Sequence, residues 1–169
     1  HTRNGYDYNN EVYQEFGRLQ FPAVSIALSR LKRGPEAKEC ALSILNATEN
    51  ILNRLGMLFS RRRITLLGSS GAIGNFLKQE LLHRVSGSHL FGVDIAAPEN
   101  SSQNMTEVKT LDDLGKDAII HTDMFIGVVG HSILRQKHLE EIMLYSRHRK
   151  IFFISGSTKT VEFADVQDY

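Results

Sequence analysis

The sequence predicts a doubly wound α/β fold with a parallel sheet, and three patterns lead to this prediction. Short apolar runs typical of buried strands alternate with stretches whose apolar residues recur at helical spacing. A glycine-rich turn joins one such run to the helix that follows it. No internal repeat or low-complexity tract interrupts the alternation. Strands alternating with helices favour a parallel sheet covered on both faces, which is a three-layer α/β/α arrangement.

The composition indicates a single soluble domain without a strongly charged partner. The 169 residues are 41% hydrophobic and 23% charged, which is enough for one well-buried core. A net charge of +1 creates no strong field for nucleic acid, and no apolar stretch approaches the ~18–20 residues of a membrane span. The lone Cys40 excludes an intrachain disulfide and favours a reducing, cytoplasmic location. The chain begins with His1 and shows no signal peptide, so we expect a fragment of a longer protein.

We expect two parts, residues 1–60 and residues 61–169, in one structural unit. The first part is an N-terminal extension with a short helix in "NNEVYQEFGRL" and a long amphipathic helix over 36–58, which starts after Gly34-Pro35. The second part holds the sheet. Its expected elements are, in order, a strand at 63–68, a helix at 72–85, a strand at 89–94, a polar stretch at 97–105, a short strand and helical turn at 106–114, a strand at 124–130, a helix at 134–146 and a strand at 150–156.

The turn "GSSGAIG" (68–74) has the order strand, glycine turn, helix that builds an anion cradle. Gly68 would make the tight turn, Gly71 would let a pyrophosphate approach the backbone, and Gly74 would let the helix pack on the strand. Asp94 lies 20 residues after Gly74, where an acid that binds the adenosine ribose is expected. Its charge would repel a 2′-phosphate, which favours NAD over NADP. The pattern predicts a Rossmann-type dinucleotide site.

The turn has three other interpretations. A P-loop requires Gly-Lys-Ser/Thr, whereas Asn75 follows the last glycine. A nucleophile elbow reads G-x-S-x-G and would use Ser70, but Ala72 occupies the last place. Nothing in the sequence couples Ser70 to a histidine such as His131, His138 or His148. The third interpretation, that the turn only packs a helix on a sheet and binds nothing, is not excluded by the sequence.

Five segments in order around the turn resemble the NAD-binding half of S-adenosylhomocysteine hydrolase, in diverged form, from about residue 21 to 166. These segments are "FPAVSI" (21–26), "ECALSILNATENIL" (39–52), "EVKTLDDL" (107–114), "DMFIGVVGHSILRQKHLEEI" (123–142) and "IFFISGSTKTVEF" (151–163).

The resemblance implies bound NAD, with the glycine turn on the pyrophosphate and the acid on the adenine ribose. The turns after the strands at 124–130 and 150–156 would lie near the nicotinamide half, as ligands of open α/β sheets sit at the carboxyl ends of strands. The expected cofactor-binding residues are Gly68, Ser69, Ser70, Gly71, Ala72, Ile73, Gly74, Asp94, Ile95, Val129, Gly130, His131, Ser155 and Gly156.

Departures from the family put hydrolysis by this chain in doubt. The family takes most acid–base residues from a separate substrate domain, which 169 residues do not accommodate. By this resemblance the family's lysine and aspartate would correspond to Lys32 and Glu36, but Ala37 replaces the neighbouring asparagine. Ser157 replaces the histidine of its "GHFD" segment, and the turn reads GxxGxxG instead of GxGxxG. No catalytic residue is therefore assigned.

Other polar residues give weaker signals. His131 follows a glycine at a cofactor-facing turn and could contact nicotinamide or donate a proton. Lys159 could meet a phosphate or an anionic substrate, while Lys32 is expected in a solvated loop. The run Arg61–Arg63 is expected to form a solvated rim. The histidines and Cys40 show no metal-ligand spacing, so no metal is expected.

The sequence thus predicts an NAD(H)-binding domain that supplies cofactor for hydride transfer in a larger protein. Two alternatives remain: a non-catalytic module that senses or is regulated by a dinucleotide, and a domain of another NAD-dependent dehydrogenase. The absence of a Tyr-x-x-x-Lys pair weighs against a short-chain dehydrogenase. The long helix or the N-terminal segment is expected to contact the rest of the parent protein or a second copy of it.

Overall fold

The fold was analysed in a computed structural model, which describes residues 2–27, 29–97, 105–148, 150–157 and 162–166. Five parallel strands form one sheet in the order β3-β2-β1-β4-β5. The strands are β1 Ile64–Leu67, β2 Leu90–Val93, β3 Thr106–Val108, β4 Met124–Gly127 and β5 Phe152–Ser155. This confirms the predicted parallel sheet.

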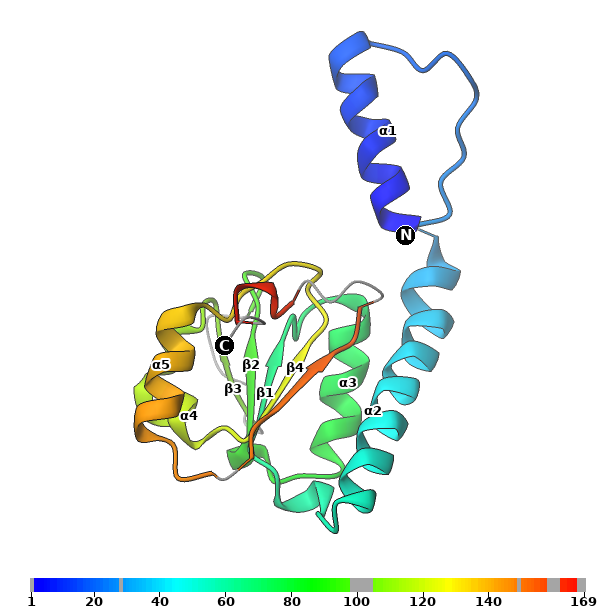
Figure 1. The fold of residues 1–169 in the computed structure, drawn as a ribbon. Coiled ribbons are helices and arrows are strands. Elements are labelled where there is room, and N and C mark those ends of the chain that lie inside the picture. Colours follow the sequence, from blue (N-terminus) through cyan, green and yellow to red (C-terminus); the bar gives the residue numbers. More distant parts are fainter. Residues whose placement is uncertain (1, 28, 98–104, 149, 158–161, 167–169) are drawn as a thin grey trace.

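Helices cover both faces of the sheet, as Figure 1 shows. Helices α2 and α3 pack against each other and lie on one face, while α4 and α5 lie on the other. The predicted three-layer Rossmann-type architecture is therefore confirmed. The helices are α1 Thr2–Phe16, α2 Ala37–Arg54, α3 Ala72–Leu82, α4 Lys116–His121 and α5 Gln136–Tyr145.

Alternation along the central strands divides the core in two. Ile64 and Leu66 of β1 belong to the cluster under α2 and α3, whereas Leu67 belongs to the cluster under α4 and α5. In β4, Ile126 joins the first cluster and Phe125 joins the second. Since successive strand side chains point to opposite faces, each central strand contributes to both layers. This explains why these strands read as continuous apolar runs.

The long helix α2 begins at Ala37, one residue from the predicted start, but Gly34-Pro35 is not the boundary that the sequence predicted. Gly34 and Pro35 do not start it, because they lie inside a π-helical turn, Lys32–Glu36, that leads directly into α2. Pro35 has no N–H to donate, and an irregular turn tolerates this loss better than a regular helix interior. Helix α2 ends at Arg54, where Gly56 follows with φ of 67°. A positive φ at this position is a common way to end a helix.

Helix α4 was not predicted. It has six residues, too few for an apolar period to be visible in the sequence. Helix α1 is longer than predicted, and it stands away from the α/β body in Figure 1. Among the described residues, no helix combines the length and apolar character needed to cross a bilayer.

Candidate functional site

The candidate site lies at the carboxyl edge of the sheet, beyond the ends of the paired strands β1 and β4. The chain leaves β1 toward β2 on one side and β4 toward β5 on the other, so the turns after β1 and β4 flank the topological switch point, where ligands of open α/β sheets bind and which we call the crevice. Gly68, directly after β1, is buried with φ of 93°. A Cβ there would come within 2.9 Å of Val129 Cγ2. The turns after β1 and β4 thus lie close together.

The glycine turn presents the N-terminus of α3 to the solvent. Gly71 is the N-cap, and in the described part of the chain no side-chain cap hydrogen bond is formed there. The Gly71 N–H donates to the Gly68 carbonyl at 3.2 Å. Ser70, Gly71 and Ala72 are exposed. Open first-turn N–H groups together with the helix dipole favour an anionic ligand at this place.

Gly74 brings α3 close to the turn. A Cβ at Gly74 would lie 1.8 Å from the Gly68 carbonyl oxygen, far inside van der Waals contact. At Gly71, by contrast, a Cβ would meet only the same oxygen at 3.5 Å. There is therefore room for a side chain at Gly71, whereas at Gly74 the backbone of Gly68 leaves none. The close packing at Gly74 agrees with the role predicted for this glycine, while the role of Gly71 toward a pyrophosphate stays a prediction.

The extra residue in the GxxG opening turns its side chain inward. Ser69 is fully buried, and its hydroxyl donates to Glu107 Oε1 at 3.0 Å. Lys78 Nζ of α3 donates to Glu107 Oε1 at 3.1 Å and to Oε2 at 3.3 Å. Only 2% of the Glu107 side chain is exposed. A buried ion pair and a hydroxyl thus fix the turn to β3 and α3, and the Ser69 hydroxyl points away from the crevice.

Asp94 is joined to the glycine turn by a direct hydrogen bond. Its Oδ2 accepts the Ser70 N–H at 3.0 Å, and its Oδ1 accepts the Ala96 N–H at 2.9 Å. An ionised carboxylate offers about four acceptor positions, so capacity for further donors remains. The next residue, Ile95, is 88% exposed beside this carboxylate. The structure therefore brings together the turn and the acid that the sequence paired over 20 residues.

The turns after β4 and β5 are held together by Glu162, which the sequence analysis did not single out. Glu162 is fully buried, and its Oε2 accepts the Ser155 hydroxyl at 2.6 Å and the Ser157 hydroxyl at 2.8 Å. Its Oε1 accepts the Gly130 N–H at 3.3 Å. The only sequence feature that could have marked Glu162 as a buried acid is its place between two apolar residues in "VEF". His131, next to Gly130, is exposed.

Other predicted features lie away from the crevice or outside the described residues. Lys32 pairs with Glu36 in the π-helical turn. Lys159 lies outside the described residues. Among the described residues, no group of three or more potential ligands could hold a metal ion.

The arginine run proved to be more than a solvated rim. Arg62 donates to Asp123 Oδ2 at 2.9 Å, and the Arg63 N–H donates to Oδ1 at 3.0 Å. Both side chains of the ion pair are mostly buried, at 15% and 4% exposed. Burial raises the pKa of Asp123, although the Arg62 charge lowers it. This cluster precedes β1 and β4, so it stands at the amino edge of the sheet, opposite the crevice.

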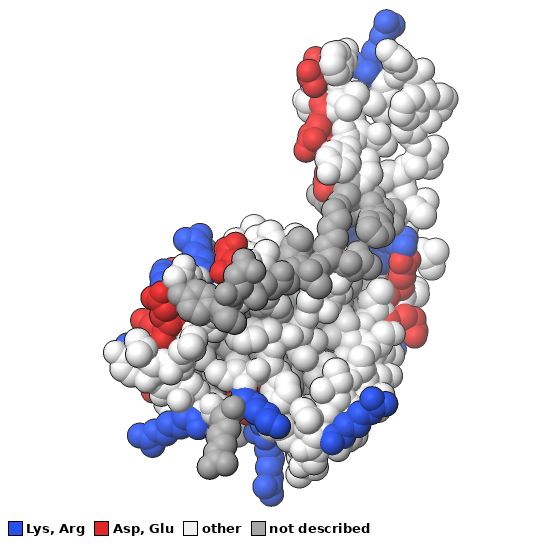
Figure 2. Space-filling model, viewed as in Figure 1, with Lys and Arg blue, Asp and Glu red and all other residues white. Residues whose placement is uncertain are grey.

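Surface charge gives no sign of a nucleic-acid interface on the face shown in Figure 2. Acidic and basic side chains are both present, and Lys and Arg lie mostly along the lower rim of the α/β body. The crevice is at the other edge. This distribution agrees with the net charge of +1.

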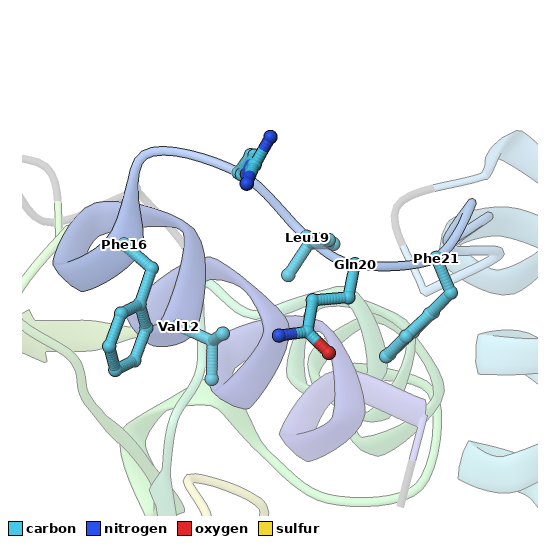
Figure 3. A pocket seen from close by; sticks show the side chains of 6 residues that line it. Val12, Phe16, Leu19, Gln20 and Phe21 are labelled. Carbon is cyan, nitrogen blue, oxygen red and sulfur yellow. The ribbon is translucent and has the colours of Figure 1, made fainter.

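A hollow lies near the N-terminus, between α1 and the segment that follows it. Figure 3 shows its lining, which is mostly apolar: Val12, Phe16, Arg18, Leu19, Gln20 and Phe21. Phe16 and Phe21 are 67% and 60% exposed. The hollow has no convergent set of polar groups, unlike the crevice, so we do not regard it as the functional site.

Comparison with solved structures supports the fold. The chain is similar to the A chain of dipicolinate synthase from Bacillus subtilis, with a TM-score of 0.51 and 12% identity over 80% of this chain and 43% of that one. It also resembles a D-isomer specific 2-hydroxyacid dehydrogenase from Xanthobacter autotrophicus Py2, solved with NADPH, with a TM-score of 0.49 and 14% identity over 73% of this chain and 42% of that one. No family model and no curated protein matches the sequence.

The fold and site define a class: a Rossmann-like α/β domain with a glycine turn at its topological switch point. At these identities the likeness extends to the fold alone. The chain spans less than half the length of both solved structures described above.

Proposed function

We propose that this chain is the NAD(H)-binding domain of a longer protein, with the pyrophosphate at the glycine turn. One observation carries the proposal: the uncapped N-terminus of α3 lies open behind Gly71, and the Asp94 carboxylate is bonded to the same turn. Helix N–H groups suit a pyrophosphate, and a carboxylate at the end of the second strand suits ribose hydroxyls. The full proposed set is Gly68, Ser69, Ser70, Gly71, Ala72, Ile73, Gly74, Asp94, Ile95, Val129, Gly130, His131, Ser155 and Gly156.

Within this set, the residues have different roles. The first turn of α3 would bind the pyrophosphate through backbone N–H groups. Ser69 would contribute structure, because its hydroxyl is committed to Glu107. Exposed Ile95 would cover one face of the adenine, and the β4 and β5 turns would receive the nicotinamide half. When bound, NAD supplies a hydride acceptor; the chain binds and orients it.

NAD is preferred to NADP in this proposal because of Asp94. A 2′-phosphate beside this carboxylate would place two negative charges close together, with no described cation bonded to the acid to offset them. The 2-hydroxyacid dehydrogenase from Xanthobacter autotrophicus Py2, which was solved with NADPH, shares only 14% identity with this chain. Its cofactor therefore does not indicate which cofactor this chain binds.

For the parent protein, we propose hydride-transfer chemistry, with this domain supplying the cofactor. The resemblance to S-adenosylhomocysteine hydrolase supports this finer assignment through its ordered segments. Ser157 and Ala37 depart from that family's motifs, so a hydrolase reaction is not proposed for this chain alone. The exposed aromatic and apolar side chains of α1, such as Tyr13 and Phe16, support a contact with the remainder of the parent or with a second copy.

A dinucleotide-sensing module without turnover is the second candidate. It is favoured by the absence of an assigned catalytic residue among the described side chains near the crevice. A domain of another NAD-dependent dehydrogenase fits the same site. Turnover assays of the full-length protein separate these candidates, because a sensor would retain NAD without converting a substrate.

Calorimetric titration of the 169-residue chain with NAD, NADH and NADP tests the binding proposal. We expect NAD and NADH to bind and NADP to bind more weakly. Asp94→Ala should reduce the difference between NAD and NADP. Failure of all three to bind at millimolar concentration would refute the proposal, and a preference for NADP would refute the role of Asp94.

Gly71→Ala makes the test sharper, because the fold accepts a methyl group at this position. The added Cβ meets only the Gly68 oxygen at an ordinary 3.5 Å. On our proposal it would nevertheless obstruct the pyrophosphate and weaken NAD binding about tenfold or more, while the melting temperature changes little. Unchanged affinity in a folded Gly71→Ala variant would argue against this location for the pyrophosphate.

A further inference from the structure

The buried carboxylate of Glu162 has surroundings that differ from those of an ordinary structural acid. It is fully buried, and its three partners among the described residues are neutral donors: the Gly130 N–H and the hydroxyls of Ser155 and Ser157. Removing a carboxylate from water is costly unless donors satisfy it. A folded chain therefore keeps such a group where it fixes several segments at once.

The three donors come from the two turns that border the crevice on the β4 and β5 side. Gly130 follows β4, while Ser155 ends β5 and Ser157 comes two residues later. One carboxylate oxygen bonds the first turn and the other bonds the second. Glu162 thus sets the distance between these turns, which are otherwise linked by the Gly156 N–H donating to the Gly127 carbonyl at 2.8 Å.

The end of β4 is shaped to admit this side chain. A Cβ at Gly127 would lie 2.8 Å from both Cβ and Cγ of Glu162. Any larger residue at the last position of β4 would therefore displace the glutamate. The strand end, the two turns and the acid form one interlocked unit.

We infer that Glu162 is a positioning residue for the half of the crevice that receives the nicotinamide. This inference rests on the proposed NAD binding and extends it. Asp94 and the α3 N-terminus lie on the β1 and β2 side, so they would hold the adenosine and pyrophosphate. A dinucleotide lying across the switch point then places its other half over the turns that Glu162 holds. Glu162 itself is buried beneath them and acts through their backbone.

Two substitutions separate this role from general stability. Glu162→Ala removes both oxygens and leaves three donors without their acceptor. Glu162→Gln keeps Oε1 for the Gly130 N–H, and its amide group can donate to the two serine hydroxyls, which also accept hydrogen bonds. Gln should therefore preserve the geometry that Ala destroys. Asp165→Ala, which removes an exposed acid three residues later, is the charge-matched control.

The measurement compares NAD with ADP-ribose, which lacks the nicotinamide, by calorimetry on the 169-residue chain. We expect Glu162→Ala to weaken NAD about tenfold or more, as for the loss of a hydrogen bond to a charged group, with ADP-ribose changed less than about threefold. Glu162→Gln and Asp165→Ala should stay within about threefold of the wild type for both ligands. The fluorescence gain of bound NADH, which reports on the nicotinamide environment, should fall in the Ala variant alone.

Other outcomes overturn the inference. Equal weakening of NAD and ADP-ribose would show that Glu162 supports the fold and not one half of the crevice. Wild-type affinity for NAD in a folded Glu162→Ala variant would show that the two turns keep their positions without the hydrogen bonds of Glu162. If Glu162→Ala does not fold, Ser157→Ala takes its place, because it removes one of the two hydroxyl donors to Glu162 Oε2. Weaker NAD binding with ADP-ribose unchanged then supports the inference, and an equal effect or no effect on the two ligands overturns it. Failure of the wild type to bind either ligand refutes the proposed function itself, and the inference with it.

Discussion

Gly74→Ala tests whether the glycine turn is closed against α3 as tightly as the structure shows. The new Cβ would lie 1.8 Å from the Gly68 oxygen and 2.8 Å from the Gly68 carbonyl carbon. Normal contact begins above about 3 Å, so the backbone must shift by more than about 1 Å. The obstructing atoms are main chain, and Gly68 has a φ of 93° that few other residues adopt. The turn therefore has little freedom to move away.

The expected cost follows from this geometry. Overpacking a core with one methyl group costs typically 1–3 kcal/mol, and a backbone obstruction belongs at the upper end or beyond. We expect Gly74→Ala to lower the free energy of unfolding by about 3 kcal/mol. For a domain of this size, that corresponds to a fall of roughly 6–12 °C in melting temperature.

Gly71→Ala is the matched control, since it adds the same methyl group three residues earlier. Gly71 has φ of −65°, which alanine adopts readily, and its Cβ would meet ordinary contact. Alanine is a poorer N-cap than glycine but reduces the entropy of the unfolded chain, so the net change should stay within about 1 kcal/mol. Urea unfolding followed by far-ultraviolet circular dichroism measures both variants, and suits a chain without tryptophan. Equal stability of the two variants would refute the packing argument.

Two further predictions concern buried charges. Lys78→Met should destabilise the chain by about 2 kcal/mol or more, because it leaves the Glu107 carboxylate buried without its cation, and the double variant Lys78→Met/Glu107→Gln should recover much of the loss in urea unfolding. No recovery in the double variant would count against the ion-pair explanation. Burial raises the pKa of Asp123 above its ordinary value despite the facing charges of Arg62 and His148, so the native state binds more protons than the unfolded state between about pH 4 and that raised pKa. The stability of the wild type relative to Asp123→Asn should therefore fall as the pH rises through this window, and a difference that is constant or rises with pH would contradict the assignment.

Much of the fold could be predicted because the informative patterns are local. Buried parallel strands such as β1 and β4 are continuous apolar runs, and α2, α3 and α5 show helical spacing. Helix α4 was missed because six residues are too short for a period. The start of α2 was predicted to within one residue, but Gly34-Pro35, which usually marks a helix boundary, lies here inside a π-helical turn that precedes α2.

Only the part of the candidate site that depends on local sequence, namely the glycine turn and the acid at the end of the next strand, could be predicted. A glycine spacing followed by an acid at a strand end reports a local requirement, so the pairing of Asp94 with the turn was found. Glu107 and Glu162 depend instead on which strands become neighbours. Ser69 and Glu107 are 38 residues apart in sequence. They meet because β2 lies between β1, which Ser69 follows, and β3, which carries Glu107. No local pattern marks such a pair.

The buried pair also explains why the turn reads GxxGxxG. The residue inserted between the first two glycines is the one whose side chain points into the protein, where Gly92 leaves room for it: a Cβ at Gly92 would lie 2.8 Å from Ser69 Oγ. Ser69 therefore fills a space made by a glycine on β2 and is bonded to an acid on β3 that α3 neutralises through Lys78. The insertion lengthens the turn on its inner side, while Ser70, Gly71 and Ala72 keep the outer side open. The spacing from Gly71 to Gly74, which sets how a ligand meets the helix, is the same as in the commoner GxGxxG motif. The unusual opening thus alters how the turn is anchored, and leaves the N-terminal end of α3, where we propose that the pyrophosphate binds, unchanged.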